Sequence, residues 1–136
     1  MSRSGYTDDC EYGWEQIMWR GAVTSAIRGK RGQQLLRELA EAMDAMPVKR
    51  LISHELVKDG EFCALGLVGA KRGLPIDKLN PEDSGEVAKT FDIAEAMARE
   101  VVYVNDDDGY WRSDETPEQR WQRVRKWVAE QIKAPA

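Results

Sequence analysis

The 136-residue sequence predicts an all-α (mainly α-helical) fold. Apolar residues recur at helical spacing in several stretches, and residues that start or stop helices flank those stretches. In addition, 42% of the residues are hydrophobic, so a chain of this length can bury a core without a metal or a disulfide. We expect a compact bundle of about five helices, with one short β-hairpin as an open alternative near residues 50–62.

The first half of the chain contains two clear helical patterns. Apolar residues between residues 14 and 27 form one stripe, and Gly29 or Gly32 is expected to end this helix. A second stripe covers residues 35–46. Pro47 stops it, because the residue before a proline is disfavoured in the α region.

The middle of the chain allows two interpretations. Residues 48–62 fit a short helix and a hairpin equally well, and the Asp-Gly pair at residues 59–60 is a hairpin turn signal. Residues 62–70 are the most apolar run of the chain. Their glycines, Gly66 and Gly69, indicate a buried helix that packs closely against a neighbour.

Two further helices are predicted in the second half. Asp83 or Ser84 can cap a helix that runs to about Tyr103. The last helix has the clearest start, because Thr116 is followed by a proline at the first helical position and by Gln119, which completes a capping box.

Composition also predicts the organisation and location of the chain. Residues 1–12 are polar and are expected to form a loose N-terminal arm, with residues 13–136 as a single helical domain. No run approaches the roughly 18 apolar residues of a membrane span, and no secretory signal is apparent. Cys10 and Cys63 are far apart, which favours two free thiols in a reducing compartment. We expect a cytoplasmic protein without membrane contact.

The formal net charge of −4 is spread unevenly along the chain. Residues 20–72 contain ten Lys or Arg against six Asp or Glu, whereas residues 73–115 contain four against twelve. This segregation predicts opposed charged patches on the surface. The overall acidity argues against generic nucleic-acid binding, which needs a clearly basic face.

Two Lys-Arg-Gly tripeptides, at residues 30–32 and 71–73, each follow an apolar-patterned run. We interpret both as helix terminators, because glycine takes positive φ readily and cations favour the negative end of the helix dipole. If these helix ends lie together, their basic side chains form one patch that can bind a partner or nucleic acid. The predicted basic patch consists of Arg28, Lys30, Arg31, Lys71 and Arg72.

An acidic loop provides a second candidate patch, formed by Asp106, Asp107 and Asp108. The loop partly fits a calcium-binding pattern, but Val104 occupies the first ligand position, where a carboxylate is normally required. We therefore expect a contact surface and no metal site. No phosphate-loop or dinucleotide-binding motif occurs, so no cofactor is predicted.

His54 is the only histidine. Its neighbours Ser53 and Glu55 would not face it on a regular helix or strand, and no nucleophile elbow is present. Cys63 lies in an apolar run, which favours the unreactive thiol over the thiolate. The sequence therefore predicts no catalytic residues.

Four segments carry a resemblance. They are the opening Met-Ser-Arg-Ser-Gly-Tyr, residues 19–33 from Trp-Arg-Gly-Ala-Val to Arg-Gly-Lys-Arg-Gly-Gln, the block Asp-Gly-Glu-Phe-Cys-Ala-Leu-Gly at 59–66, and Thr-Pro-Glu-Gln-Arg-Trp at 116–121. Together they resemble a family of small, uncharacterised proteins encoded by tailed phages and prophages. The resemblance covers most of the chain and implies a phage origin and expression in the bacterial cytoplasm. It implies no activity and no site residues.

These observations lead to a functional hypothesis. We expect a non-catalytic phage accessory protein that binds and inhibits a host protein or nucleoprotein complex, with a bacterial defence component of the CRISPR–Cas type as the favoured target (an anti-CRISPR role). The acidic patch would imitate nucleic-acid phosphates toward a basic host surface. The alternative is a nucleic-acid-binding phage regulator or packaging accessory that uses the Lys-Arg-Gly turns. The oligomeric state is left open.

Overall fold

A computed structural model describes residues 13–106 and 115–133; the predicted N-terminal arm, residues 1–12, lies outside this range. The mainly α-helical class is confirmed. The described residues also contain a two-stranded antiparallel hairpin, which decides between the alternatives left open for residues 50–62. The elements are α1 (Gly13–Arg28), α2 (Lys30–Asp44), β1 (Val57–Lys58), β2 (Glu61–Phe62), α3 (Ala64–Arg72), the 3-10 turn η1 (Ile76–Lys78), α4 (Ser84–Phe91), α5 (Glu95–Asp106) and α6 (Pro117–Gln131).

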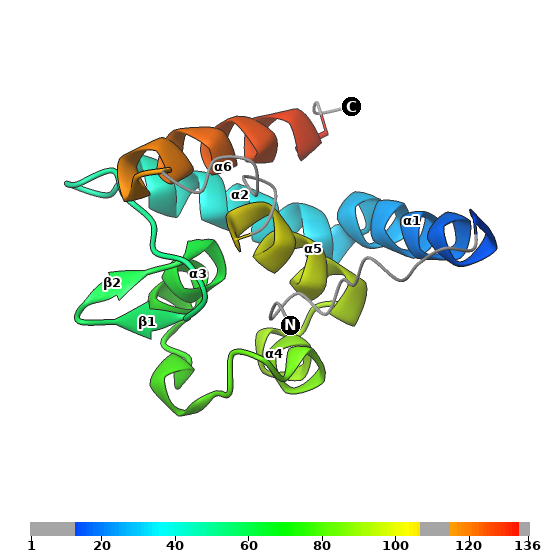
Figure 1. Cartoon of the computed structure of the whole chain (residues 1–136), viewed down its shortest axis with the longest axis horizontal. Helices are drawn as coiled ribbons and strands as arrows, with labels where there is room; N and C mark the ends of the chain where they lie inside the picture. The colour runs from blue at the N-terminus through cyan, green and yellow to red at the C-terminus, as the bar shows by residue number, and fades with distance from the viewer. Residues whose placement is uncertain (1–12, 107–114, 134–136) are drawn as a thin grey trace.

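Helices α2 and α5 organise the packing (Figure 1). Helix α2 packs against α1, α3 and α6, while α5 packs against α1, α3, α4 and α6. One hydrophobic core joins all six helices. Its largest fully buried side chains include Leu35, Leu36, Leu39, Met43, Leu65, Val68, Phe91, Met97, Val101 and Val124. None of the helices in the described range has the length and apolar character needed to cross a bilayer.

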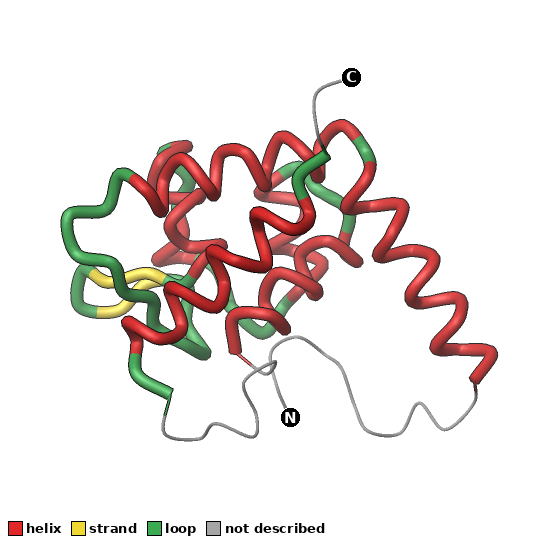
Figure 2. Tube along the Cα trace, turned by 90° about the horizontal axis from the view of Figure 1, so that it is seen from above, coloured by secondary structure: helices red, strands yellow, loops and turns green. Residues whose placement is uncertain are grey.

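The first Lys-Arg-Gly tripeptide begins a helix, so its interpretation as a helix terminator was wrong. Helix α1 ends at Arg28, and Gly29 alone separates it from α2, with φ −67° and ψ 163°. The two helices meet at an open corner (Figure 2). Glycine is needed at position 32 for close approach and not for positive φ, because a Cβ there would overlap the carbonyl oxygen of Ala26.

The second tripeptide behaves as predicted. Gly73 is the C-cap of α3, with φ 73° and ψ 26° in the left-handed region. The predicted close packing of this helix is also confirmed. A Cβ on Gly66 would overlap the Leu56 carbonyl, and one on Gly69 would overlap the side chains of Ile76 and Phe91.

The hairpin follows from its Asp-Gly turn. Asp59 and Gly60 both have positive φ, at 53° and 78°, as a two-residue type I′ turn requires. Val57 pairs with Phe62 in the resulting register.

The helix predicted from Asp83 or Ser84 to about Tyr103 is in fact two helices. Asp92 adopts φ 54° and ends α4, and α5 begins at Glu95. Ile93 does not fit the helical stripe of this segment, yet it is buried, because the break turns it toward the core. This break raises the described count to six helices from the five expected.

The start of α6 is confirmed in detail. The Thr116 hydroxyl accepts the Gln119 backbone N–H at 3.1 Å, and the Gln119 side chain accepts the Thr116 N–H at 2.9 Å. This capping box satisfies the backbone N–H groups of Thr116 and Gln119 at the start of α6.

Candidate functional site

The arginines of the two tripeptides reach the same helix end. Arg72 donates to the Phe91 carbonyl at 2.8 Å, and the Arg31 guanidinium lies 3.1 Å from the Asp92 carboxylate. Phe91 is the last residue of α4 and Asp92 is its C-cap. The structure thus brings the side chains of Arg31 and Arg72, which are far apart in sequence, to one turn.

Arg72 is part of the fold itself. Its guanidinium makes two hydrogen bonds to Glu38, of 2.9 and 2.5 Å, and its side chain is 24% exposed. The hydrogen bonds to Glu38 raise the pKa of Arg72 above its usual value and keep it charged. Arg72 therefore ties α3 to α2 and α4, and it is not free to bind a partner.

The other predicted basic residues are exposed. Arg28, Lys30 and Lys71 make no side-chain hydrogen bond or ion pair within the described residues. Arg31 pairs with Asp92 at the surface, where an ion pair contributes at most about 1 kcal/mol, so a partner's anionic group can replace Asp92. We call Arg28, Lys30, Arg31 and Lys71 the basic surface.

A small hollow lies beside Lys30 and Arg31 of the basic surface. Its volume is about 200 Å³, smaller than the roughly 300–1,000 Å³ of typical ligand pockets. It therefore suits an inserted side chain or a single anionic group better than a larger ligand. The lining residues are Ser25, Ala26, Gly29, Lys30, Arg31, Gly32 and Ala94.

Asp106 of the predicted acidic patch uses its carboxylate for hydrogen bonds within the fold. Its Oδ1 accepts the His54 backbone N–H at 3.1 Å and the Asn105 side-chain amide at 2.8 Å, and the residue is half-buried. Asp107 and Asp108 lie outside the described residues. Asp106 thus contributes to the fold by holding the turn at His54.

The side chain of His54 contacts that of Ser53. His54 lies on neither a helix nor a strand: its φ is 70°, and its Nδ1 lies 2.9 Å from the Ser53 hydroxyl. Within the described range, no carboxylate forms a hydrogen bond with the imidazole. Among the residues that the structure describes, the Ser-His contact therefore has no carboxylate in the third position of a catalytic triad.

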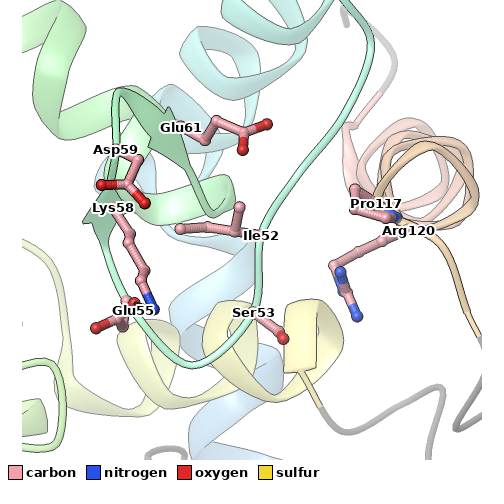
Figure 3. A pocket seen from close by; sticks show the side chains of 8 residues that line it. All are labelled: Ile52, Ser53, Glu55, Lys58, Asp59, Glu61, Pro117 and Arg120. Carbon is pink, nitrogen blue, oxygen red and sulfur yellow. Dashed lines mark ion pairs between the residues drawn. The ribbon is translucent and has the colours of Figure 1, made fainter.

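An open hollow of about 290 Å³ adjoins this turn. In Figure 3, the charged hairpin residues lie on one side, Pro117 and Arg120 lie on the other, and Ile52 lies between them. The hairpin side carries both signs of charge, and Glu55 pairs with Lys58 at 3.9 Å. This mixed lining favours no single ligand. The charged residues on this side are Glu55, which precedes β1, and Lys58, Asp59 and Glu61 of the hairpin.

Two arginines of α6 have internal roles that the sequence did not reveal. Arg123 donates to the Val104 and Asn105 carbonyls at 2.5 and 3.2 Å and forms two hydrogen bonds with Glu115, of 2.7 and 2.9 Å. Arg120 also donates to the Asn105 carbonyl, at 3.2 Å. Both arginines therefore donate hydrogen bonds to backbone carbonyls in the last turn of α5. The spacing of three residues places Arg120 and Arg123 on the same face of a helix, and this much could be predicted from the sequence. The sequence did not show which element would pack against that face.

Two more basic side chains, Lys49 and Arg125, bind the C-terminal end of α2. Lys49 Nζ donates to the carbonyls of Asp44 and Met46, each at 2.6 Å, at the end of α2. Arg125 binds the Asp44 carboxylate at 2.8 and 3.0 Å, which lowers the pKa of Asp44 and raises that of Arg125. Much of the basic charge is thus used inside the fold, which sets the exposed basic surface apart.

Within the described residues, no group of three or more His, Cys, Asp or Glu side chains is placed to hold a metal ion. Comparisons with protein-family models, with curated proteins and with solved structures found no match to this chain.

Proposed function

We propose that this chain is a non-catalytic, phage-encoded accessory protein that binds a host macromolecule in the bacterial cytoplasm through its basic surface. The convergence of the two Lys-Arg-Gly tripeptides on the end of α4 carries this proposal. The phage origin rests on the sequence resemblance. The favoured target is a component of a bacterial defence system of the CRISPR–Cas type.

Geometry favours the basic surface over the acidic patch as the contact region. Asp106 uses its carboxylate within the fold, whereas Lys30 and Lys71 are exposed and make no ion pair in the described range. Charged groups at the rim of an interface steer association and suppress wrong partners. We therefore expect the host protein or nucleoprotein to present acidic side chains to this surface.

The double variant Lys30→Glu/Lys71→Glu tests this proposal. Like charges then face the partner, so affinity for the host component should fall on the order of 10- to 100-fold, measured by calorimetric titration. Lys78→Glu/Lys126→Glu is the matched control, since both lysines are exposed and lie outside the basic surface. Equal affinities of the two double variants would contradict the assignment of the surface.

A plaque assay tests the target class. Wild-type protein expressed in bacteria with an active CRISPR–Cas system should restore plating of a targeted phage, and the Lys30→Glu/Lys71→Glu variant should not. Failure of the wild type across the tested system types would exclude this target.

The same convergence favours one alternative, a nucleic-acid-binding regulator or packaging accessory. A mobility-shift assay with duplex DNA at low and high salt separates the two functions. We expect no retarded complex; salt-sensitive retardation that the double variant loses would establish the alternative.

A further inference from the structure

The junction between α1 and α2 differs from a continuous helix at one torsion angle. Gly29 has φ −67°, a helical value, but its ψ is 163° where a helix needs about −42°. Helical hydrogen bonds persist on both sides: Gly29 N–H donates to the Ser25 carbonyl and Gln33 N–H donates to the Gly29 carbonyl, each at 2.9 Å. Rotation of this ψ would join α1 and α2 into one helix about 48 Å long.

Side chains take the place of backbone donors at this corner. In a continuous helix, the carbonyls of Ile27 and Arg28 would accept the N–H groups of residues 31 and 32. In the bent chain, Ile27 O accepts the buried Gln33 side chain at 2.8 Å, and Arg28 O accepts the Lys133 ammonium at 2.6 Å. The corner is therefore held by two side-chain contacts that a straight helix would not need.

Helix α1 packs against α5 and α2. Arg20 pairs with Glu100 of α5 at 2.9 Å, the Arg99 guanidinium lies 5.5 Å from the Trp19 ring, and Val23 is 2% exposed. A straightened helix would carry α1 away from this site. Exposure of that apolar surface is unfavourable, but the α1 of a second copy can fill the same site with the same contacts.

We propose that Gly29 is a hinge through which two copies of this chain exchange α1, so that α1 of each copy packs on α5 of the other. The partner is a second copy because its α1 brings the same side chains to the surface of α5 that α1 already covers. Gly32 favours the bent form, since only glycine avoids a clash with the Ala26 carbonyl there. The hinge also divides the basic surface, because Arg28 precedes it and Lys30 follows it, so exchange would respace those charges.

Two substitutions shift the hinge in opposite directions. Gly32→Ala adds a methyl group that the corner excludes and a straight helix accepts, so it should convert the monomer to a dimer. Lys30→Pro should keep the chain monomeric, because proline suits the first position of α2 and requires the extended ψ that Gly29 already has. Gly21→Ala is the control, since nothing lies within 4 Å of its added Cβ, and it should behave as the wild type.

Light scattering after size-exclusion chromatography measures these states. A folded, monomeric Gly32→Ala variant, or a dimeric Lys30→Pro variant, would overturn the proposal. If Gly32→Ala does not fold, wild type and Lys30→Pro are refolded at high concentration. A dimer from the wild type alone supports exchange, and equal behaviour of the two chains contradicts it.

A charge-swap experiment distinguishes exchange from surface association. In the Gly32→Ala background, chains with Arg20→Glu are mixed with chains with Glu100→Arg and refolded together. If α1 is exchanged, only the heterodimer restores both ion pairs. Native mass spectrometry should then find that heterodimers make up more than the half of all dimers that random pairing would give. A statistical mixture would contradict exchange of α1. Neither result depends on the host partner.

Discussion

Replacement of Gly66 by alanine should destabilise the fold by about 3 kcal/mol or more, a large part of the 5–15 kcal/mol that typically stabilises a domain. A Cβ at this position would overlap the backbone carbonyl of Leu56, the residue just before the hairpin. Backbone cannot move aside by a rotamer change, so α3 would have to separate from this segment. Denaturant unfolding followed by circular dichroism measures the loss.

Gly21→Ala is the matched control, because Gly21 is an exposed helical glycine with open space around it. It should raise the free energy of unfolding by about 0.5–1 kcal/mol through helix propensity alone. A Gly66→Ala variant as stable as this control would show that α3 and Leu56 do not approach as closely as described.

Replacement of Arg123 by methionine should cost about 3 kcal/mol, near the lower end expected when a buried ion pair loses one partner. The Glu115 side chain is 5% exposed and would lose its 2.7 Å ion pair with Arg123, while its longer contact with Arg120, at 3.6 Å, would remain. The Val104 carbonyl would lose its 2.5 Å donor at the same time. The midpoint of denaturant unfolding should fall accordingly.

Lys126→Met on the same helix separates this role from a general loss of basic charge. Lys126 is exposed, so its substitution should change the free energy of unfolding by less than about 0.5 kcal/mol. Equal effects of the two substitutions would contradict the internal role of Arg123.

The sequence predicted those features that depend on local chemistry. The capping box at Thr116, the left-handed cap at Gly73 and the close packing at Gly66 each follow from a few neighbouring residues, and the structure contains all three. The fold class followed from the periodicity of the apolar residues.

Features that depend on distant residues could not be predicted in this way. The role of Gly32 depends on Ala26 across a corner, and the roles of Arg72 and Arg123 depend on carbonyls at the ends of α4 and α5. One local feature of the sequence indicated the break at Asp92: the apolar residue Ile93 lies outside the helical stripe. The structure buries it. Charge counting therefore overestimated the free basic patch by including Arg72.

The central claim is that the basic surface is the binding site. It is tested most directly by lysine acetylation of the complex that the tagged protein forms with its host component, captured from a bacterial lysate. Peptide mass spectrometry compares the labelling rate of each exposed lysine in the free and bound protein. We predict that Lys30 and Lys71 are protected on binding, while Lys78 and Lys126 react as in the free protein. Unchanged labelling of Lys30 and Lys71 in the complex would contradict the proposal that the basic surface is the binding site.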